Sequence, residues 1–257
     1  MRKKYLKGIV AGMMVGAVVM SGIKTWAGSV DGSAKGMKKN FGEPYNPTKA
    51  VNYAAKYCGK NEGGRDAEGY NNSFPWWCTK EAYKKDVDSN KGGDCINFVS
   101  QCVAYGGFLQ VDDGSECKSD GYMRACDTSV DPYWYAQKRR NGNWRATDTW
   151  FNNVKFKNYM TTQRGVTMYS CDTIKRASLV AQPGDAVQVV VNRNGGTKPI
   201  HALIVTKVDK DGTVHMAAHN SNRSDTTLEK QYNGFKDEGK ITFNVFKFSS
   251  FEFINCK

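Results

Sequence analysis

Residues 92–103 read GGDCINFVSQCV, and they carry the strongest structural signal in this chain of 257 residues. The apolar side chains recur at three- and four-residue intervals, at Phe98, Val99, Cys102 and Val103. This spacing is typical of the buried stripe of a helix. Gly106 and Gly107 follow, and glycine readily takes the left-handed conformation that ends a helix. The sequence therefore predicts a buried helix that begins near Cys95.

The segments on either side predict helices first and strands afterwards. Asn46-Pro47 combines a capping residue with proline at the first helical position, so a helix is expected over residues 47–58. Another helix is expected near 148–160, within an insertion of about 109–180. Four stretches rich in Val, Ile and Phe predict strands: 185–191, 200–208, 213–218 and 241–248. We expect the last three to form an antiparallel sheet, and this order of elements indicates an α+β fold.

The composition of the chain and its first residues limit the classes of protein to which it can belong. With 40% hydrophobic residues, 24% charged residues and a mean hydropathy of −0.60, the chain is neither disordered nor a polytopic membrane protein. Residues 1–27 join a basic start, an apolar run and a small-residue cleavage site, which predicts a signal peptide. A retained membrane anchor is the alternative. Residues 28–44 predict a flexible tail and 45–257 one domain, so we expect a secreted protein, free or associated with the cell envelope.

The charge of the chain indicates which partners it attracts. The formal net charge is +12, and removal of the five basic residues of the signal peptide would lower it to +7. A basic exported protein is attracted to polyanions such as an anionic envelope surface. The longest basic run is Lys138-Arg139-Arg140, which is typical of a solvated face. We therefore expect no nucleic-acid partner, and we expect the protein to be a monomer.

Eight cysteines in an exported chain favour disulfide bonds. Cys95 and Cys102 lie seven residues apart on one predicted helix, about 10 Å along its axis, which is too far for a mutual bridge. The other six can form three bridges, although many connectivities are open. Proximity and order favour the pairs Cys58 with Cys78, Cys117 with Cys126, and Cys171 with Cys256.

Cys95 is the candidate nucleophile. It opens the predicted helix, and a helix N-terminus beside an imidazolium stabilises a thiolate, so we expect a depressed pKa for its thiol. Gly92 and Gly93 allow a tight turn and a close approach of substrate, and the Cys95 amide can donate to an oxyanion. Asp94 also stands at the substrate site, where we expect its side chain to point away from the thiolate and cap the helix. The alternative is a structural cysteine, which is the interpretation for Cys102.

A cysteine nucleophile needs a base, and the sequence contains three histidines. His201 is the best candidate because it begins a strand of apolar neighbours, where an imidazole requires a specific partner. His215 lies just past a turn and is expected to be exposed. Asn220 or His219, at the end of the adjacent strand, could orient the ring, and the neutral amide of Asn220 is favoured. A metal site on His215 and His219 is the alternative, but no further ligand stands at a suitable offset, so we expect no metal and no cofactor.

Two adjacent tryptophans, Trp76 and Trp77, are candidates for substrate contacts. Their rings could line a groove for a sugar or a peptide, although buried packing is the commoner role of such side chains.

The motifs resemble a known family. Residues 92–101 (GGDCINFVSQ), followed by Gly106-Gly107, are similar to the signature of the putative amidase domain family of exported bacterial proteins. Weaker matches follow the same order, at Tyr45-Asn46-Pro47, Trp144, Trp150, Pro183-Gly184-Asp185, residues 201–206 (HALIVT) and residues 219–223 (HNSNR). The resemblance implies a papain-like fold related to the cysteine amidohydrolases and peptidases that act on peptidoglycan. It implies Cys95 as nucleophile and His201 as base, while the third residue of such domains varies among Asn, Asp, Glu and His.

The sequence supports three hypotheses for function. The first is an exported cysteine amidase or peptidase that cleaves an amide of peptidoglycan, or of a peptide, through a thioester. The second keeps the thioester but passes the acyl group to an amine, as transglutaminase-like enzymes do. The third is a non-catalytic wall-binding or toxin-like module on the same fold.

Overall fold

The computed structural model describes residues 44–58, 71, 74, 94–112, 122–124, 132–138, 144–193, 195–219 and 223–250. By contacts between residues the chain divides into two units. The first, Met1–Ser29 with Asn255–Lys257, lies outside the described residues, and so does the predicted signal peptide. All of the described residues belong to the second unit, Val30–Ile254. Within the described ranges, no helix is long and apolar enough to cross a membrane.

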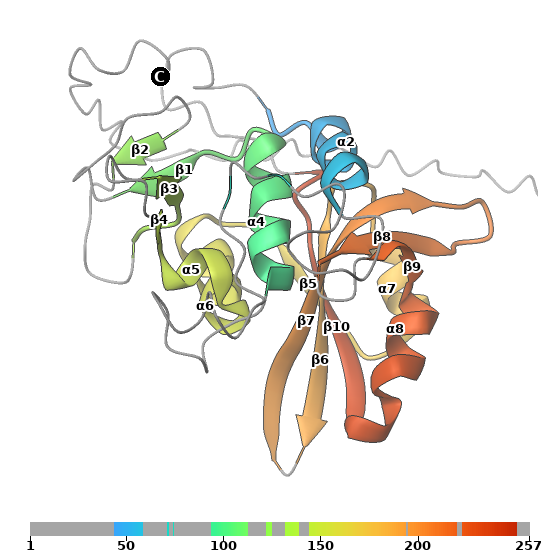
Figure 1. Cartoon of the computed structure of the whole chain (residues 1–257). Helices are drawn as coiled ribbons and strands as arrows, with labels where there is room; N and C mark the ends of the chain where they lie inside the picture. Colours follow the sequence, from blue (N-terminus) through green and yellow to red (C-terminus); the bar gives the residue numbers. More distant parts are fainter. Residues whose placement is uncertain are drawn as a thin grey trace, which may run out of the picture. The chain divides into compact units, whose positions relative to one another are not determined.

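An antiparallel sheet in the order β5-β10-β6-β7-β8-β9 forms the C-terminal half of the unit (Figure 1). Its strands are β5 (Met168–Cys171), β6 (Ala186–Arg193), β7 (Gly196–Val208), β8 (Val214–Ala218), β9 (Arg223–Thr227) and β10 (Lys240–Phe246). The predicted antiparallel sheet is confirmed. The last strand, however, pairs with β6 and β5 and not with its predecessors β8 and β9.

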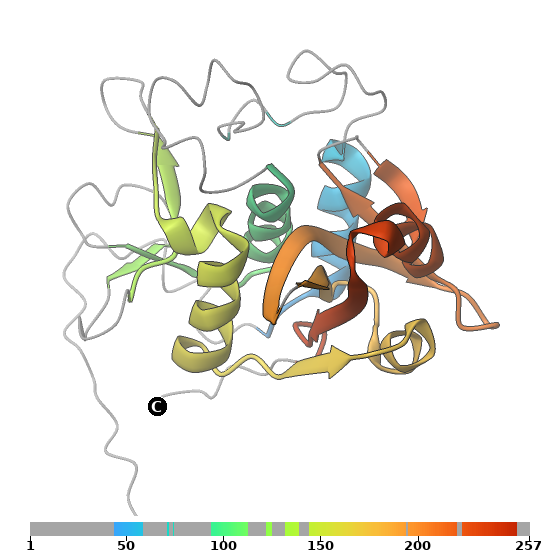
Figure 2. The ribbon, with the colours of Figure 1, turned by 90° about the horizontal axis from the view of Figure 1, so that it is seen from below.

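The two faces of this sheet carry separate apolar clusters, because successive side chains of a strand point to opposite faces. Ala186, Ala202 and Ile204 lie in the cluster with α4 (Asp94–Tyr105). Val187 and Leu203 lie in the second cluster, which α7 (Ile174–Val180) and α8 (Leu228–Phe235) cover. Figure 2 shows these helices on opposite sides of the sheet. The chain is therefore of the α+β class.

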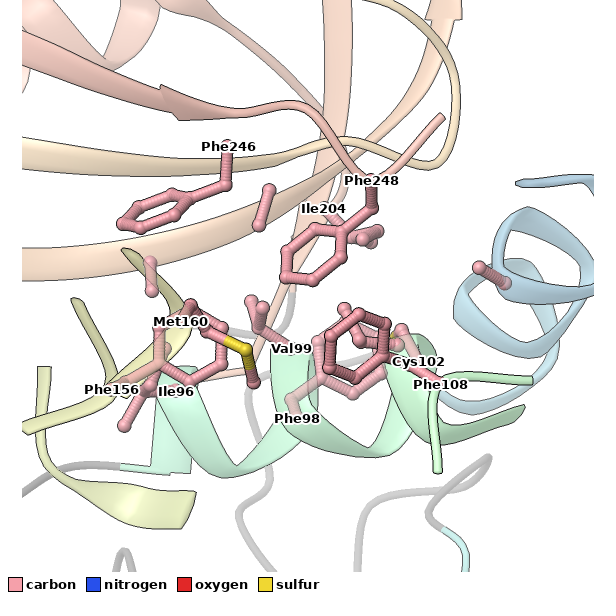
Figure 3. Packing of buried hydrophobic residues seen from close by; sticks show 14 of the residues in the cluster. Ile96, Phe98, Val99, Cys102, Phe108, Phe156, Met160, Ile204, Phe246 and Phe248 are labelled. Carbon is pink, nitrogen blue, oxygen red and sulfur yellow. The ribbon is translucent and has the colours of Figure 1, made fainter. Parts of the chain in front are cut away.

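The predicted helices at the start of the domain are confirmed. α2 (Pro47–Tyr57) begins with proline, and the side chain of its capping residue, Asn46, accepts from the Lys49 amide at 3.0 Å. α4 is buried at every residue from Asp94 to Val103, as its apolar stripe predicts. In Figure 3 its side chains, including Val99 and Cys102, pack against Ile204 and Phe248. Helix α4 thus packs against both the sheet and α2.

Two glycines, Gly106 and Gly184, lie in close contact with the start of α2. The amide of Asn46 donates to the Gly106 carbonyl at 2.7 Å, which ties the start of α2 to the end of α4. A Cβ on Gly106 would lie 2.2 Å from the ring of Tyr45. The Tyr45 hydroxyl donates to the Gly184 carbonyl at 2.8 Å, and a Cβ on Gly184, whose φ is +89°, would lie 2.5 Å from Pro47. Larger residues at either glycine would push α2 away from the core.

Where the structure describes it, the predicted insertion of about 109–180 contains short elements, among them β5 and α7. The others are β1 (Gln110–Asp112), β2 (Tyr122–Arg124), β3 (Ala136–Lys138), β4 (Trp144–Ala146), α5 (Asp148–Phe151), α6 (Asn153–Asn158) and the π-helical turn η3 (Tyr159–Gln163). The single helix expected near 148–160 is therefore divided. The backbone of Asn152 is extended, and its side chain accepts from the amides of Val154 and Lys155 at 3.0 and 3.1 Å, so a new helix begins after it.

The cysteines of the described residues are unbridged. Cys58, Cys95, Cys102 and Cys171 are buried free thiols. The structure does not form the bridges predicted from Cys58 and Cys171, because each of these thiols is enclosed in its own apolar cluster, one on each face of the sheet. The free state predicted for Cys95 and Cys102 is confirmed. The partners proposed for the bridges, Cys78, Cys117, Cys126 and Cys256, lie outside the described residues.

Candidate active site

The thiol of Cys95 lies in the first turn of α4, where it is only 2% exposed. Three N–H groups contact its sulphur. The side-chain amide of Asn153, at the start of α6, lies 3.8 Å from Sγ, and the backbone amides of Ala202 and Ile96 also hydrogen-bond to it. Ala202 belongs to β7, so the nucleophile predicted from the sequence lies against the central strands. Such donors favour a negative charge on the sulphur.

Burial affects the pKa of the Cys95 thiol more than these hydrogen bonds do. It raises the pKa of Cys95 to about 11, and the charge of Asp94 adds to this, while the amides of Ala202, Asn153 and Ile96 lower it. The expectation of a depressed pKa is therefore wrong, because loss of water around the thiolate outweighs the favourable helix N-terminus. At neutral pH the thiol is protonated, so a nucleophilic Cys95 requires a base.

Asp94, predicted at the substrate site, is fully buried and anchors the start of α4 internally. Its Oδ1 accepts from Asn97 Nδ2 at 2.8 Å, and its Oδ2 pairs with Nδ1 of His219. The Nε2 of His219 donates to the Tyr57 carbonyl at 2.7 Å, since that oxygen can only accept. The imidazole therefore joins the last turn of α2, the first turn of α4 and the end of β8.

The polar residues of the central motif extend this internal network. Asn97 Oδ1 accepts from Trp150 Nε1 at 2.8 Å, and the Ser100 hydroxyl donates to the Trp150 carbonyl at 2.8 Å. Gln101 Oε1 accepts from the Tyr53 hydroxyl at 2.7 Å. The polar residues Asn97, Ser100 and Gln101 therefore have a structural role, because their hydrogen bonds attach α2 and α5 to α4.

His201 stands on β7 directly before Ala202, the residue whose amide meets the Cys95 sulphur. Its ring is buried, and its centroid lies 6.2 Å from that of Phe235 on α8. By strand alternation His201 shares the face of Leu203, while Ala202 shares that of Cys95. The ladder between β6 and β7 shifts register between Val189 and Val190, opposite this position.

The remaining histidines have separate partners. His215 lies near the sheet edge, with Nδ1 2.6 Å from Asp225 and Nε2 2.8 Å from Asp209. His219, weighed as an orienting residue and as a metal ligand, has both ring nitrogens on Asp94 and Tyr57. His215 and His219 thus do not share a ligand position in the structure.

Four other predicted site residues lie outside the described residues: Trp76, Trp77, Gly93 and Asn220.

Asn153 is a functional candidate that sequence reasoning missed. It contacts Cys95 across 58 residues of chain, and the backbone carbonyl of Asn153 accepts from Gln188 Nε2 at 2.8 Å. Neither residue belongs to a motif. The available signal was Gln188 itself, a lone polar residue within the apolar strand AVQVVV.

The comparisons agree with this arrangement of motifs. The family described as putative amidase domain matches residues 44–245, which include α2, α4, Cys95, His201 and His219. No curated protein and no solved structure matches the chain. The family match covers most of the 257 residues, so the chain belongs to the putative amidase domain family.

Proposed function

We propose that this chain is an exported cysteine amidase or peptidase with a papain-like core, and that it hydrolyses an amide of peptidoglycan through a thioester. Family membership supports amide hydrolysis. The observation that carries the cysteine mechanism is the Cys95 sulphur, placed at the start of a buried helix with three N–H groups directed at it. The papain-like assignment is supported by that helix packing on an antiparallel sheet.

In this mechanism the Cys95 thiol passes its proton to a base and the sulphur attacks the substrate carbonyl carbon. The C–N bond breaks as the amine leaves with that proton. Water then hydrolyses the thioester, which releases the carboxylic acid and restores the thiol. The N–H groups around the sulphur stabilise the negative charge that these steps develop.

We propose His201 as the base. It directly precedes Ala202, whose amide meets the Cys95 sulphur, but strand alternation puts its ring on the face of Leu203. To act as the base, the ring must therefore reach the sulphur around the strand at the register shift between β6 and β7. Such irregularities are frequent beside active sites, where they redirect a side chain. Asn220 is the proposed orienting residue, because the two nitrogens of His219 are already engaged by Asp94 and Tyr57.

The proposed substrate rests on charge and on export. Without residues 1–27 the formal net charge falls from +12 to +7, and a chain of this charge is attracted to an anionic cell wall. The proposed location, outside the cell or at its envelope, rests on the basic and apolar first residues.

The test is digestion of purified peptidoglycan followed by mass analysis of the fragments. The wild-type chain should release fragments with a new carboxylate and a new amine. Cys95→Ala should abolish this release, and Cys102→Ala, on the same helix but away from the three donors, should not. A wild-type chain that binds the wall and releases nothing would support the non-catalytic module instead. Products that form only with an added amine would support the acyl-transfer enzyme.

A further inference from the structure

A row of polar side chains crosses the sheet face that otherwise packs against α4. Ser170 on β5, Asn244 on β10, Gln188 on β6 and Ala202 on β7 are successive partners in the strand register. Asn244 and Gln188 are both buried. Their neighbours on this face, Ala186 and Phe246, belong to the apolar cluster. Buried polar residues in such a place are costly unless their hydrogen bonds are satisfied.

The row is connected by hydrogen bonds and ends at the candidate nucleophile. The Ser170 hydroxyl lies 2.9 Å from Asn244 Oδ1, and Asn244 Nδ2 lies 3.4 Å from Gln188 Oε1. Gln188 Nε2 then lies 2.8 Å from the Asn153 carbonyl and 3.3 Å from Asn153 Oδ1. Asn153 Nδ2 lies 3.8 Å from the Cys95 sulphur.

The orientation of every amide in the row follows from one backbone atom. The Asn153 carbonyl can only accept, so the Gln188 atom beside it is the donor Nε2. That donor also faces the Asn153 side chain, which must therefore present its acceptor Oδ1 to Gln188. The opposite atom of the same planar amide, the donor Nδ2, then faces Cys95. The hydrogen-bond pattern thus directs an N–H, and not a carbonyl oxygen, at the sulphur.

We propose that Asn153 is a catalytic residue that stabilises the Cys95 thiolate through its side-chain N–H, with Gln188 and Asn244 as positioning residues. This inference rests on the proposed function of Cys95. When the thiol proton moves to the base, negative charge develops on Sγ and the N–H of Asn153 becomes a charge-assisted donor. Connected hydrogen bonds polarise one another, so the row strengthens this donor. Burial raises the pKa of the Cys95 thiol, whereas the hydrogen bond from Asn153 lowers it, as stabilisation of the thiolate requires.

The first test measures ionisation of Cys95 without any substrate. The ultraviolet absorbance of the thiolate is followed against pH in the full chain, and the same titration of Cys95→Ala is subtracted to isolate this thiol. For Asn153→Ala, the titration of the double variant Asn153→Ala/Cys95→Ala is subtracted. Asn153→Ala should lower the thiolate fraction of Cys95 about tenfold at each pH below the midpoint, which is a shift of about one pKa unit. Asn158→Ala is the matched control, because Asn158 is an exposed residue of the same helix.

The outcomes of this test are decisive for Asn153. A shift in Asn153→Ala and none in Asn158→Ala supports the proposal. Coincident titrations of Asn153→Ala and the wild type would overturn it. A wild-type chain that hydrolyses no amide would refute the proposed function, and the titration would still report separately whether Asn153 stabilises the thiolate.

The second test addresses the positioning residues and remains informative if Asn153→Ala fails to fold. Gln188→Met keeps the length of the side chain and removes both the donor to Asn153 and the acceptor for Asn244. Its Cys95 titration should move in the same direction as that of Asn153→Ala, by a smaller amount, because Asn153 stays in place but can rotate. On a substrate found by digestion, kcat should fall in Asn153→Ala and Gln188→Met with little change in KM. An unaltered titration and kcat in Gln188→Met would exclude the positioning role.

Discussion

The carboxylate of Asp94 pairs with Nδ1 of His219, 125 residues further along the chain, and both side chains are almost completely buried. The other nitrogen of the imidazole holds the Tyr57 carbonyl, and the ring stacks on Phe98 with centroids 4.0 Å apart. Through His219, Asp94, the residue of α4 next to Cys95, is connected to the end of β8 and to the last turn of α2. It is therefore a structural anchor of the candidate site.

We predict that His219→Ala lowers the free energy of unfolding by about 3–5 kcal/mol, because the buried Asp94 carboxylate loses the imidazole that faces its Oδ2. Urea unfolding measures this change. His215→Ala is the control, since the partners of His215 are partly exposed, and it should cost no more than about 1 kcal/mol. Equal losses in the two variants would contradict the anchoring role of His219.

We predict that alkaline pH destabilises the wild-type chain more than Cys95→Ala. The pKa of Cys95 is raised from 9.0 to about 11 in the folded chain, so the folded state keeps a proton that the unfolded state loses. The stabilisation from this thiol is complete below pH 9.0 and is lost as the pH rises through about 11. The difference amounts to roughly 2–3 kcal/mol. Urea midpoints of the two chains, measured across this range, should converge or cross as the pH rises, and parallel curves would refute the raised pKa.

We predict that His201→Ala abolishes amide hydrolysis and leaves the chain folded. Loss of the base leaves a thiol that is protonated at neutral pH and cannot attack a carbonyl. Product release and circular dichroism measure the two properties. His215→Ala should retain activity. If His201→Ala were active and His219→Ala were inactive yet folded, the base would have to be reassigned to His219.

We predict a pH-dependent contribution from the His215 cluster at the edge of the sheet. Hydrogen bonds donated by the His215 ring to the carboxylates of Asp225 and then Asp209 raise the pKa of His215 above 6.5. A raised pKa means that the folded state binds the proton more tightly, so the stabilisation is complete below pH 6.5 and disappears as the pH rises through the folded value. His215→Gln should therefore lower stability at mildly acidic pH, by no more than about 1 kcal/mol in total, and this effect should fade as the pH rises through the raised pKa of His215. The opposite pH dependence would show that the two carboxylates do not hold the imidazolium.

We predict at least four reactive thiols after unfolding without reductant. Cys58, Cys95, Cys102 and Cys171 are free in the structure, so each should be alkylated once the chain is denatured. Peptide mass analysis identifies the modified residues. Modification confined to Cys95 and Cys102 would instead support the three bridges suggested by the spacing of the cysteines.

The fold could be predicted where periodicity is strong. Residues 47–58 and 92–103 show clear helical spacing, and the structure places α2 and α4 there. The four predicted strands correspond to β6, β7, β8 and β10. The sequence did not predict β5, α7, β9 and α8, which have eight residues or fewer each. They acquire stability by pairing with the sheet or packing on it, which local sequence does not reveal.

The candidate site was predictable only in its local part. Cys95 follows from a helix start, a property of adjacent residues. The pKa of that thiol depends on burial by distant segments, and sequence reasoning therefore gave its direction wrongly. Asn153 and Gln188 meet only through the register of β6 and the turn at Asn152, so no spacing along the chain indicates them.

The polar row beneath Cys95 also makes the candidate site dependent on segments that are distant in the sequence. Its contacts join residues 58, 35, 56 and 74 positions apart, and the final partner, Asn244, belongs to the last strand. Contacts of such high contact order form late in folding. A chain that ends before β10 therefore contains Cys95, Asn153 and Gln188 but lacks Asn244, which bonds Gln188 Oε1. Truncation ahead of residue 240 should thus remove both this contact and the strand that pairs with β5 and β6, so the support of the candidate site extends to the C-terminal strand.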